Sequence, residues 1–299
     1  MQRTLKEILE VQRSDYDANF SHVEHQITCD EPPKATIRLH YVKADASGEP
    51  RCKQLARALV RYITHYCFLA ERRKDLSETD RNEMFMRARD LFRVAEQTGQ
   101  VGELLIYFLL ETVLGAPQVL KKMLMTTNPK EERKGSDGVH LRWDESAEVL
   151  DIIFAESKLY SSFSQALSDA FKSVDGFHES RTKAHEINAF TSGFSVLSPQ
   201  LQEKIVSYIE GENTSKCRHT QACLIGFDWD EYKCLRDNRR AEFIKTFDAR
   251  YRNWAAGVRD SLNLKLQACK HKHLMFEFFM LPFESVEKFR NWFLIELTG

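Results

Sequence analysis

The sequence lacks the features that mark several large classes of protein. Its longest apolar runs, such as residues 104–110, are far shorter than the roughly 20 residues that a membrane-spanning helix needs. No glycine-rich cluster precedes a predicted helix, which excludes a P-loop and a dinucleotide-binding motif. The seven cysteines are odd in number and scattered. We therefore expect reduced thiols in a cytoplasmic protein, with no secretory signal and no membrane partner.

The chain also lacks an excess of charge of either sign. Its 43 basic and 44 acidic residues leave a formal net charge of −1. A protein that binds DNA by itself usually carries a basic excess, because phosphate neutralisation supplies most of the non-specific affinity. This chain therefore acts on something other than nucleic acid, or a partner delivers the strand. Basic residues outnumber acidic ones within residues 236–272, which fits either a nucleic-acid surface or a solvated helix face.

The sequence does contain a β-hairpin that ends in charged residues. The apolar run over residues 149–155 predicts a strand buried on both faces. Glu156 and Lys158 follow it on one face, because side chains two positions apart in a strand point the same way. Burying both charges costs several kcal/mol unless a partner is present. A divalent cation between Glu156 and Asp137, at the start of the preceding strand, is one such partner, and a buried structural ion pair is the alternative.

A second Glu-x-Lys occurs at Glu132 and Lys134. It lies in a polar segment over residues 128–135 that begins with Asn-Pro, which predicts a solvated loop. Only the pair at Glu156 and Lys158 follows an apolar strand, so only this pair is a candidate site.

An acidic residue at the start of one strand, with Glu-x-Lys at the end of the next, resembles the pattern of the PD-(D/E)XK nuclease superfamily. The segments 102–111, 135–140 and 154–160 are similar to HamA, the family of nuclease subunits of bacterial Hachiman anti-phage systems. The similarity extends from about residue 80 to the C-terminus. It implies an α/β (α+β) fold with a restriction-endonuclease-like αβββαβ core, and the predicted order of elements agrees with that core.

The resemblance also implies roles for individual residues. Asp137 and Glu156 would bind Mg²⁺ or Mn²⁺, with the backbone carbonyl of Ser157 as a further ligand. Lys158 would orient or deprotonate the attacking water and stabilise the charge of the transition state. Glu103, in the first core helix, would bind the water shell of the metal or a second ion.

Three further positions are weaker candidates. Glu111 competes with Glu103 for its role less well, since it follows an apolar stretch. Gln165 stands where related nucleases often have a glutamine that contacts DNA, but Asp169 replaces the tyrosine that accompanies it there. Gln165 fits equally well as part of a capping box with Ser162, at the start of the helix that follows the hairpin.

We give structural interpretations to two cysteine–histidine groups and to one aromatic stripe. Neither group contains the CxxC pair typical of a zinc finger, so we expect no zinc site. The aromatic stripe predicts core packing. The groups are Cys217, His219, Cys223 and Cys234, and Cys269, His271 and His273; the stripe is Phe276, Phe278, Phe279 and Phe283.

The chain divides at a charged segment, residues 71–75, into an accessory N-terminal region (1–80) and a nuclease-like domain (81–299). In the first region we expect a polar helix over 3–26, a strand over 35–41 and a helix around 55–66. In the second we expect helices over 82–97 and 103–114, an edge strand within 117–125, the hairpin, a helix from 162, a helix from 199, a strand over 222–227, a helix over 230–262, a strand over 273–281 stopped by Pro282, and a final helix.

The expected function is a metal-dependent DNA endonuclease effector of an anti-phage complex. The resemblance implies a superfamily-2 helicase partner, HamB, that restrains the nuclease and supplies it with DNA. The alternative is a non-catalytic helicase-binding subunit that keeps only the fold. All four charged residues of the predicted site are present, which favours the enzyme. Cleavage of RNA instead of DNA stays open.

Overall fold

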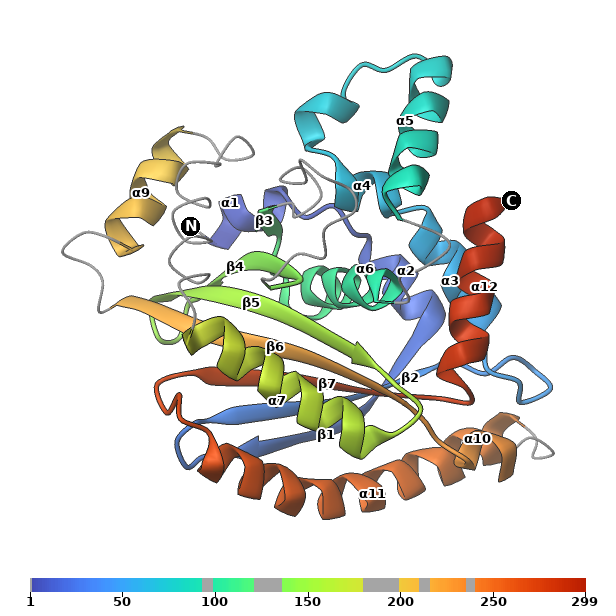
Figure 1. The fold of residues 1–299 in the computed structure, drawn as a ribbon. Coiled ribbons are helices and arrows are strands. Elements are labelled where there is room, and N and C mark those ends of the chain that lie inside the picture. Colours follow the sequence, from blue (N-terminus) through green and yellow to red (C-terminus); the bar gives the residue numbers. More distant parts are fainter. Residues whose placement is uncertain (1, 93–98, 121–135, 180–198, 210–215, 235–239) are drawn as a thin grey trace.

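The computed structural model describes residues 2–92, 99–120, 136–179, 199–209, 216–234 and 240–299. A seven-stranded sheet, ordered β1-β2-β7-β6-β5-β4-β3, runs through the middle of the molecule (Figure 1). Its strands are β1 (Phe20–Cys29), β2 (Ala35–Val42), β3 (Gln118–Leu120), β4 (Gly138–Asp144), β5 (Val149–Leu159), β6 (Cys217–Asp228) and β7 (Met275–Phe283). The strands β2, β7, β6 and β5 are parallel neighbours, and the pairs at both ends of the sheet are antiparallel. The sheet is therefore mixed, as expected for an α/β (α+β) fold.

Helices cover both faces of this sheet (Figure 1). The helices of the described residues are α1 (Gln2–Glu7), α2 (Arg13–Asn19), α3 (Cys52–Val60), α4 (Ile63–Cys67), a 3₁₀ turn η1 (Ala70–Arg73), α5 (Glu78–Leu91), α6 (Gln100–Leu109) with a π-helical continuation η2 (Leu110–Leu114), α7 (Phe163–Glu179), α9 (Pro199–Ile209), α10 (Glu231–Cys234), α11 (Arg240–Ala268) and α12 (Val286–Thr298). One core cluster joins α3, α4, α6 and α12 to the sheet, and a second joins α7 and α11 to its other face. No helix within these described ranges is long and apolar enough to cross a membrane.

The core expected from the resemblance is present in the predicted order. The helix α6 is followed by the antiparallel strands β3, β4 and β5, then by α7 and by β6, which pairs with β5 in parallel. Successive side chains of β5 point to opposite faces of the sheet. Ile153 and Ala155 join the cluster of α6, so Glu156 and Lys158 lie on the opposite face, which α7 covers.

The prediction of one polar helix over residues 3–26 was wrong. Two short helices, α1 and α2, occupy its first part, and residues 20–29 form β1 at the edge of the sheet. Phe20 and Val23 are buried there, so tertiary packing decides the structure of a segment whose local composition is polar. The strands β1 and β2 extend the same sheet that carries the hairpin. The division of the chain near residue 80 stays a prediction.

Pro282 was also interpreted wrongly, because β7 continues through it to Phe283. The ladder between β2 and β7 ends at Leu39 and Met280, whereas β6 pairs with β7 along its whole length. The proline therefore lies where β7 has only one neighbouring strand, and its missing N–H removes no bond to β2. The helix expected over 82–97 begins earlier, at Glu78. It ends at Leu91. Residues 93–97 of that expected helix, 121–125 of the expected edge strand and 235–239 of the expected long helix lie outside the described residues.

Candidate active site

The hairpin brings Asp137 against the end of β5. The backbone N–H of Asp137 donates to the carbonyl of Ala155 (2.8 Å), directly before the ladder of β4 and β5 begins. Its Oδ2 atom accepts two hydrogen bonds from Ser157, one from the backbone N–H (2.7 Å) and one from the hydroxyl (2.9 Å). The Asp137 carboxylate is therefore fixed to the strand that carries Glu156 and Lys158.

Glu156 and Lys158 form an ion pair, with 2.6 Å between Nζ and Oε1. Glu156 is buried, and burial together with the nearby Asp137 carboxylate raises its pKa to about 7, although Lys158 acts in the opposite direction. Burial lowers the pKa of Lys158, but Glu156 and Asp137 outweigh this effect, and the pKa is raised above its ordinary value. The ammonium form of Lys158 is thus favoured. This suits a role in orienting water and stabilising charge better than a role in removing a proton.

Glu103 approaches the start of β4 from α6, which packs on the face of β5 opposite Glu156 and Lys158. A Cβ atom on the preceding Gly102 would lie only 2.8 Å from the hydroxyl oxygen of Ser157, so the glycine allows the helix to approach β5 closely. The hydroxyl of Tyr66 lies 3.0 Å from Oε2 of Glu103 and 3.3 Å from the backbone carbonyl of Asp137. Glu103 therefore lies beside the start of β4, and Tyr66 connects the two.

The carboxylates of this site suit a hard divalent cation that keeps most of its water ligands. No group of three or more His, Cys, Asp or Glu residues in the described part of the chain is arranged to hold a metal ion. Mg²⁺, however, is usually bound through one or two carboxylates and keeps several waters. Asp137 lies across the hairpin from the buried Glu156, and the repulsion between two carboxylates raises the pKa of Glu156 beyond the effect of burial. A cation between them would relieve this repulsion.

Glu111, the weaker candidate, has a structural role. It is buried, and its carboxylate accepts backbone N–H groups from Glu10 (2.7 Å), Val11 (2.8 Å) and Gln118 (3.2 Å). These contacts attach the segment after α1 and the start of β3 to the end of α6. The apolar stretch before Glu111 pointed to such a buried position.

The helix α7 begins as the capping pattern predicted. The backbone N–H of Gln165 donates to the hydroxyl of Ser162 (3.4 Å). Asp169, where related nucleases have tyrosine, pairs with Lys172 (2.8 Å). Its pKa is lowered by that hydrogen bond and, more weakly, by the charge of Lys158. The substitution thus places an acidic side chain within electrostatic reach of the site.

Two residues of α7 lie beside the second cysteine–histidine group, at residues 269–273, and the sequence did not predict them. The helix α7 adds His178, whose ring centre lies 5.1 Å from that of His271, and Asp175, whose Oδ1 lies 3.5 Å from Nε2 of His271. The spacing within residues 269–273 gave no sign of this contribution, since it comes from an element almost 100 positions earlier.

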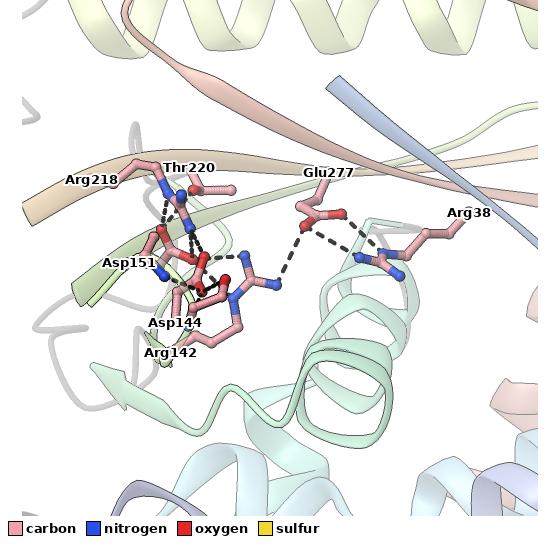
Figure 2. Close-up of polar contacts among 9 residues, drawn as sticks. Arg38, Arg142, Asp144, Asp151, Arg218, Thr220 and Glu277 are labelled. Carbon is pink, nitrogen blue, oxygen red and sulfur yellow. Dashed lines mark hydrogen bonds and ion pairs between the residues drawn. The ribbon is translucent and has the colours of Figure 1, made fainter. Parts of the chain in front are cut away.

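A separate network of charges crosses the sheet from the start of β5 to β2 (Figure 2). Asp151, at the start of β5, is fully buried and pairs with Arg142 of β4 (2.6 Å) and Arg218 of β6 (2.5 Å). Arg218 also pairs with Asp144, and Arg142 extends to Glu277 of β7 (3.4 Å). Glu277 in turn pairs with Arg38 of β2 (2.9 Å). The network balances three arginines with three carboxylates, and it ties five strands together.

Comparison with known families gives one match. The model of the HamA family matches residues 16–297. The matched range includes all the residues of the candidate site and both strands β1 and β2. The comparison with curated proteins returned no match.

Proposed function

The chain belongs to the HamA family and is thus a component of the Hachiman anti-phage defence system; on this premise we propose that it is a metal-dependent DNA endonuclease. The observation that carries the proposal is the arrangement of Asp137, Glu156 and Lys158 at the adjoining ends of β4 and β5. Strongly perturbed pKa values are concentrated at functional sites. The buried position of Glu156 beside the Asp137 carboxylate, which raises its pKa, is consistent with such a site.

Each residue has a distinct task in this proposal. Asp137, held by its two hydrogen bonds from Ser157, and Glu156 would hold the cation together with the Ser157 carbonyl. A bound Mg²⁺ or Mn²⁺ supplies positive charge for the phosphate and lowers the pKa of a water. Lys158 presents an ammonium group with three donors, which orients the attacking water and stabilises the negative charge that develops on the phosphate oxygens. Glu103 orients further waters at the same end of β4.

The proposed partner is a superfamily-2 helicase that restrains the nuclease and delivers DNA to it. The net charge of −1 supports this part of the proposal. A chain with so little positive charge gains little from phosphate neutralisation by itself. The motor of a helicase partner would bring DNA to the chain, which the charge of the chain does not attract by itself.

The proposal is tested with two site variants in the full chain, together with the partner helicase. Glu156→Gln and Lys158→Ala should each lower the cleavage rate by about 100-fold or more, because each removes electrostatic stabilisation of the transition state. The matched control is Lys233→Ala, which removes one positive charge from an exposed pair with Asp230 on α10. It should cleave at the normal rate. Cleavage should stop with EDTA, and Ca²⁺ should support it poorly because its coordination is longer and looser than that of Mg²⁺.

Four results would change the assignment. Normal cleavage by Lys158→Ala, or cleavage by clean protein in EDTA, would contradict the proposed metal-dependent mechanism. Wild-type protein that binds the helicase but cleaves neither DNA nor RNA would identify the non-catalytic subunit. Faster cleavage of an RNA of the same sequence would move the substrate from DNA to RNA.

A further inference from the structure

Tyr66 contributes to the candidate site from outside the predicted nuclease domain. It lies in α4, within the first 80 residues, and only 1% of its surface is exposed. Its hydroxyl is 3.0 Å from the Glu103 carboxylate and 3.3 Å from the Asp137 carbonyl. Two acidic residues from α6 and from the start of β4 therefore meet at one buried phenol.

The chemistry of this contact is asymmetric. Burial first, and then the charges of Glu103 and Asp137, raise the pKa of Tyr66 well above its ordinary value. The side chain is thus a neutral donor with one proton, and both neighbouring oxygens are acceptors. The charge-assisted bond to Glu103 is the shorter of the two, as expected for a carboxylate acceptor. The carbonyl of Asp137 remains within reach of the same hydroxyl.

The ring of Tyr66 is held in place by other aromatic rings. Its centre lies 5.8 Å from that of Phe92 and 5.5 Å from that of Tyr107, and the three belong to one buried cluster. A hydroxyl on a ring packed in this way has a fixed position. Glu103, by contrast, is a long side chain with several rotatable bonds, and one hydrogen bond restricts it strongly.

We propose that Tyr66 is a positioning residue, whose hydroxyl holds the Glu103 carboxylate beside Asp137 so that both acidic residues face the divalent cation of the active site. The inference rests on the proposed function in one respect, the presence of a cation at Asp137 and Glu156. It extends the site beyond the predicted nuclease domain, because α4 precedes that domain in the chain. Partners that orient metal-binding groups in this way typically change metal affinity or activity by about 10- to 100-fold when they are lost.

The first test measures Mn²⁺ binding to the full chain by electron paramagnetic resonance, without DNA. Tyr66→Phe keeps the ring and removes only the hydroxyl, and it should raise the dissociation constant for Mn²⁺ about tenfold. The matched control is Tyr107→Phe. Tyr107 is equally buried and packs on Tyr66, but its hydroxyl contacts Glu10 (3.3 Å). Its loss should leave Mn²⁺ affinity unchanged.

A second measurement separates positioning from packing. If Tyr66 acts through Glu103, then Glu103→Gln should lower Mn²⁺ affinity in wild-type protein but should have little further effect in the Tyr66→Phe background. Additive losses would overturn the inference, as would wild-type affinity in Tyr66→Phe or an equal loss in Tyr107→Phe. So would a wild-type chain that binds no Mn²⁺.

The two proposals fail in different ways. A wild-type chain that binds Mn²⁺ but cleaves no nucleic acid refutes the nuclease proposal, whereas the affinities of the variants still decide the role of Tyr66. A chain that cleaves DNA, with Mn²⁺ binding insensitive to Tyr66→Phe, refutes the positioning role alone.

Discussion

Glu111 illustrates how one buried carboxyl group fixes the path of the chain. Its two oxygens receive three backbone N–H groups from segments about 100 positions earlier and seven positions later. Burial raises its pKa from 4.5 to about 7, even though these hydrogen bonds favour the ionised form. Desolvation is therefore the larger effect at this residue.

The raised pKa of Glu111 makes stability depend on pH. Because the folded state binds this proton more tightly than the unfolded state, the stabilisation is fully present below pH 4.5 and is lost as pH rises through about 7. The shift corresponds to at most roughly 3 kcal/mol. Glu111→Gln cannot ionise, so its free energy of unfolding relative to wild type should rise between pH 5 and pH 8.

Urea denaturation at several pH values checks this expectation. Glu83→Gln is the control, because Glu83 on α5 forms an exposed pair with Arg87 one turn later. Its difference from wild type should change little with pH. Parallel pH profiles for Glu111→Gln and wild type would show that Glu111 does not titrate in this range.

The sequence predicted the hairpin residues but not the residues that support them. Asp137, Glu156 and Lys158 follow from a local pattern, an apolar strand with a charged end, and the structure brings them together. Tyr66 lies 37 positions from Glu103 and 71 from Asp137. Periodicity relates neighbours within one element, so it carries no information about such contacts.

Among the elements, the charge network of Figure 2 contributes to stability through Asp151. Asp151→Ala would leave Arg142 and Arg218 without their shared buried partner. Removing one member of a buried ion pair costs about 3 to 5 kcal/mol. We expect the lower end of this range, since both arginines keep partial access to water.

Chemical denaturation tests the role of Asp151, with Arg87→Ala as the control. Arg87 forms an exposed pair on α5, and its loss should cost about 0.5 kcal/mol or less. An equally small loss for Asp151→Ala would mean that the network contributes no net stability. Cleavage by folded Asp151→Ala should be normal, because Asp151 lies at the start of β5 and Glu156 lies near its end.

The elements that were predicted correctly are those with strong local periodicity or clear ends. The helix α6 with its continuation ends at Gly115, whose φ of 61° requires the left-handed conformation that glycine favours. The strand β1 was missed because its local composition is polar, and its pairing with β2 and the burial of Phe20 and Val23 are tertiary contacts. The prediction for Pro282 was wrong because a proline removes a ladder hydrogen bond only where a neighbouring strand would accept one. The sequence does not show where β2 stops pairing with β7.

For the molecule as a whole, charge limits what the chain can bind alone. The helix α11 carries Lys245, Arg252 and Arg259 on its exposed side at intervals of seven residues, but the total net charge is −1. Binding of duplex DNA by the isolated chain should therefore be no tighter than non-specific binding, about 10⁻⁴ to 10⁻⁶ M at physiological salt. The proposed helicase partner should strengthen this binding.

Fluorescence anisotropy over a salt series, with and without the helicase, measures this difference. The affinity of the chain alone should fall only gently with salt, because few phosphates are neutralised. Submicromolar binding by the chain alone at physiological salt, unchanged by the helicase, would contradict delivery by a partner and indicate a self-sufficient nuclease.

The position of β7 determines when this sheet can form during synthesis. β7 lies between β2 and β6, and the pair of Arg38 with Glu277 joins residues 239 positions apart. A ribosome releases the hairpin and its charged end long before it releases β7. Until then β2 and β6 each present an unpaired edge, and such long-range pairing folds slowly and is prone to aggregation. The nascent chain therefore completes the sheet beside the candidate site only after β7 has left the ribosome.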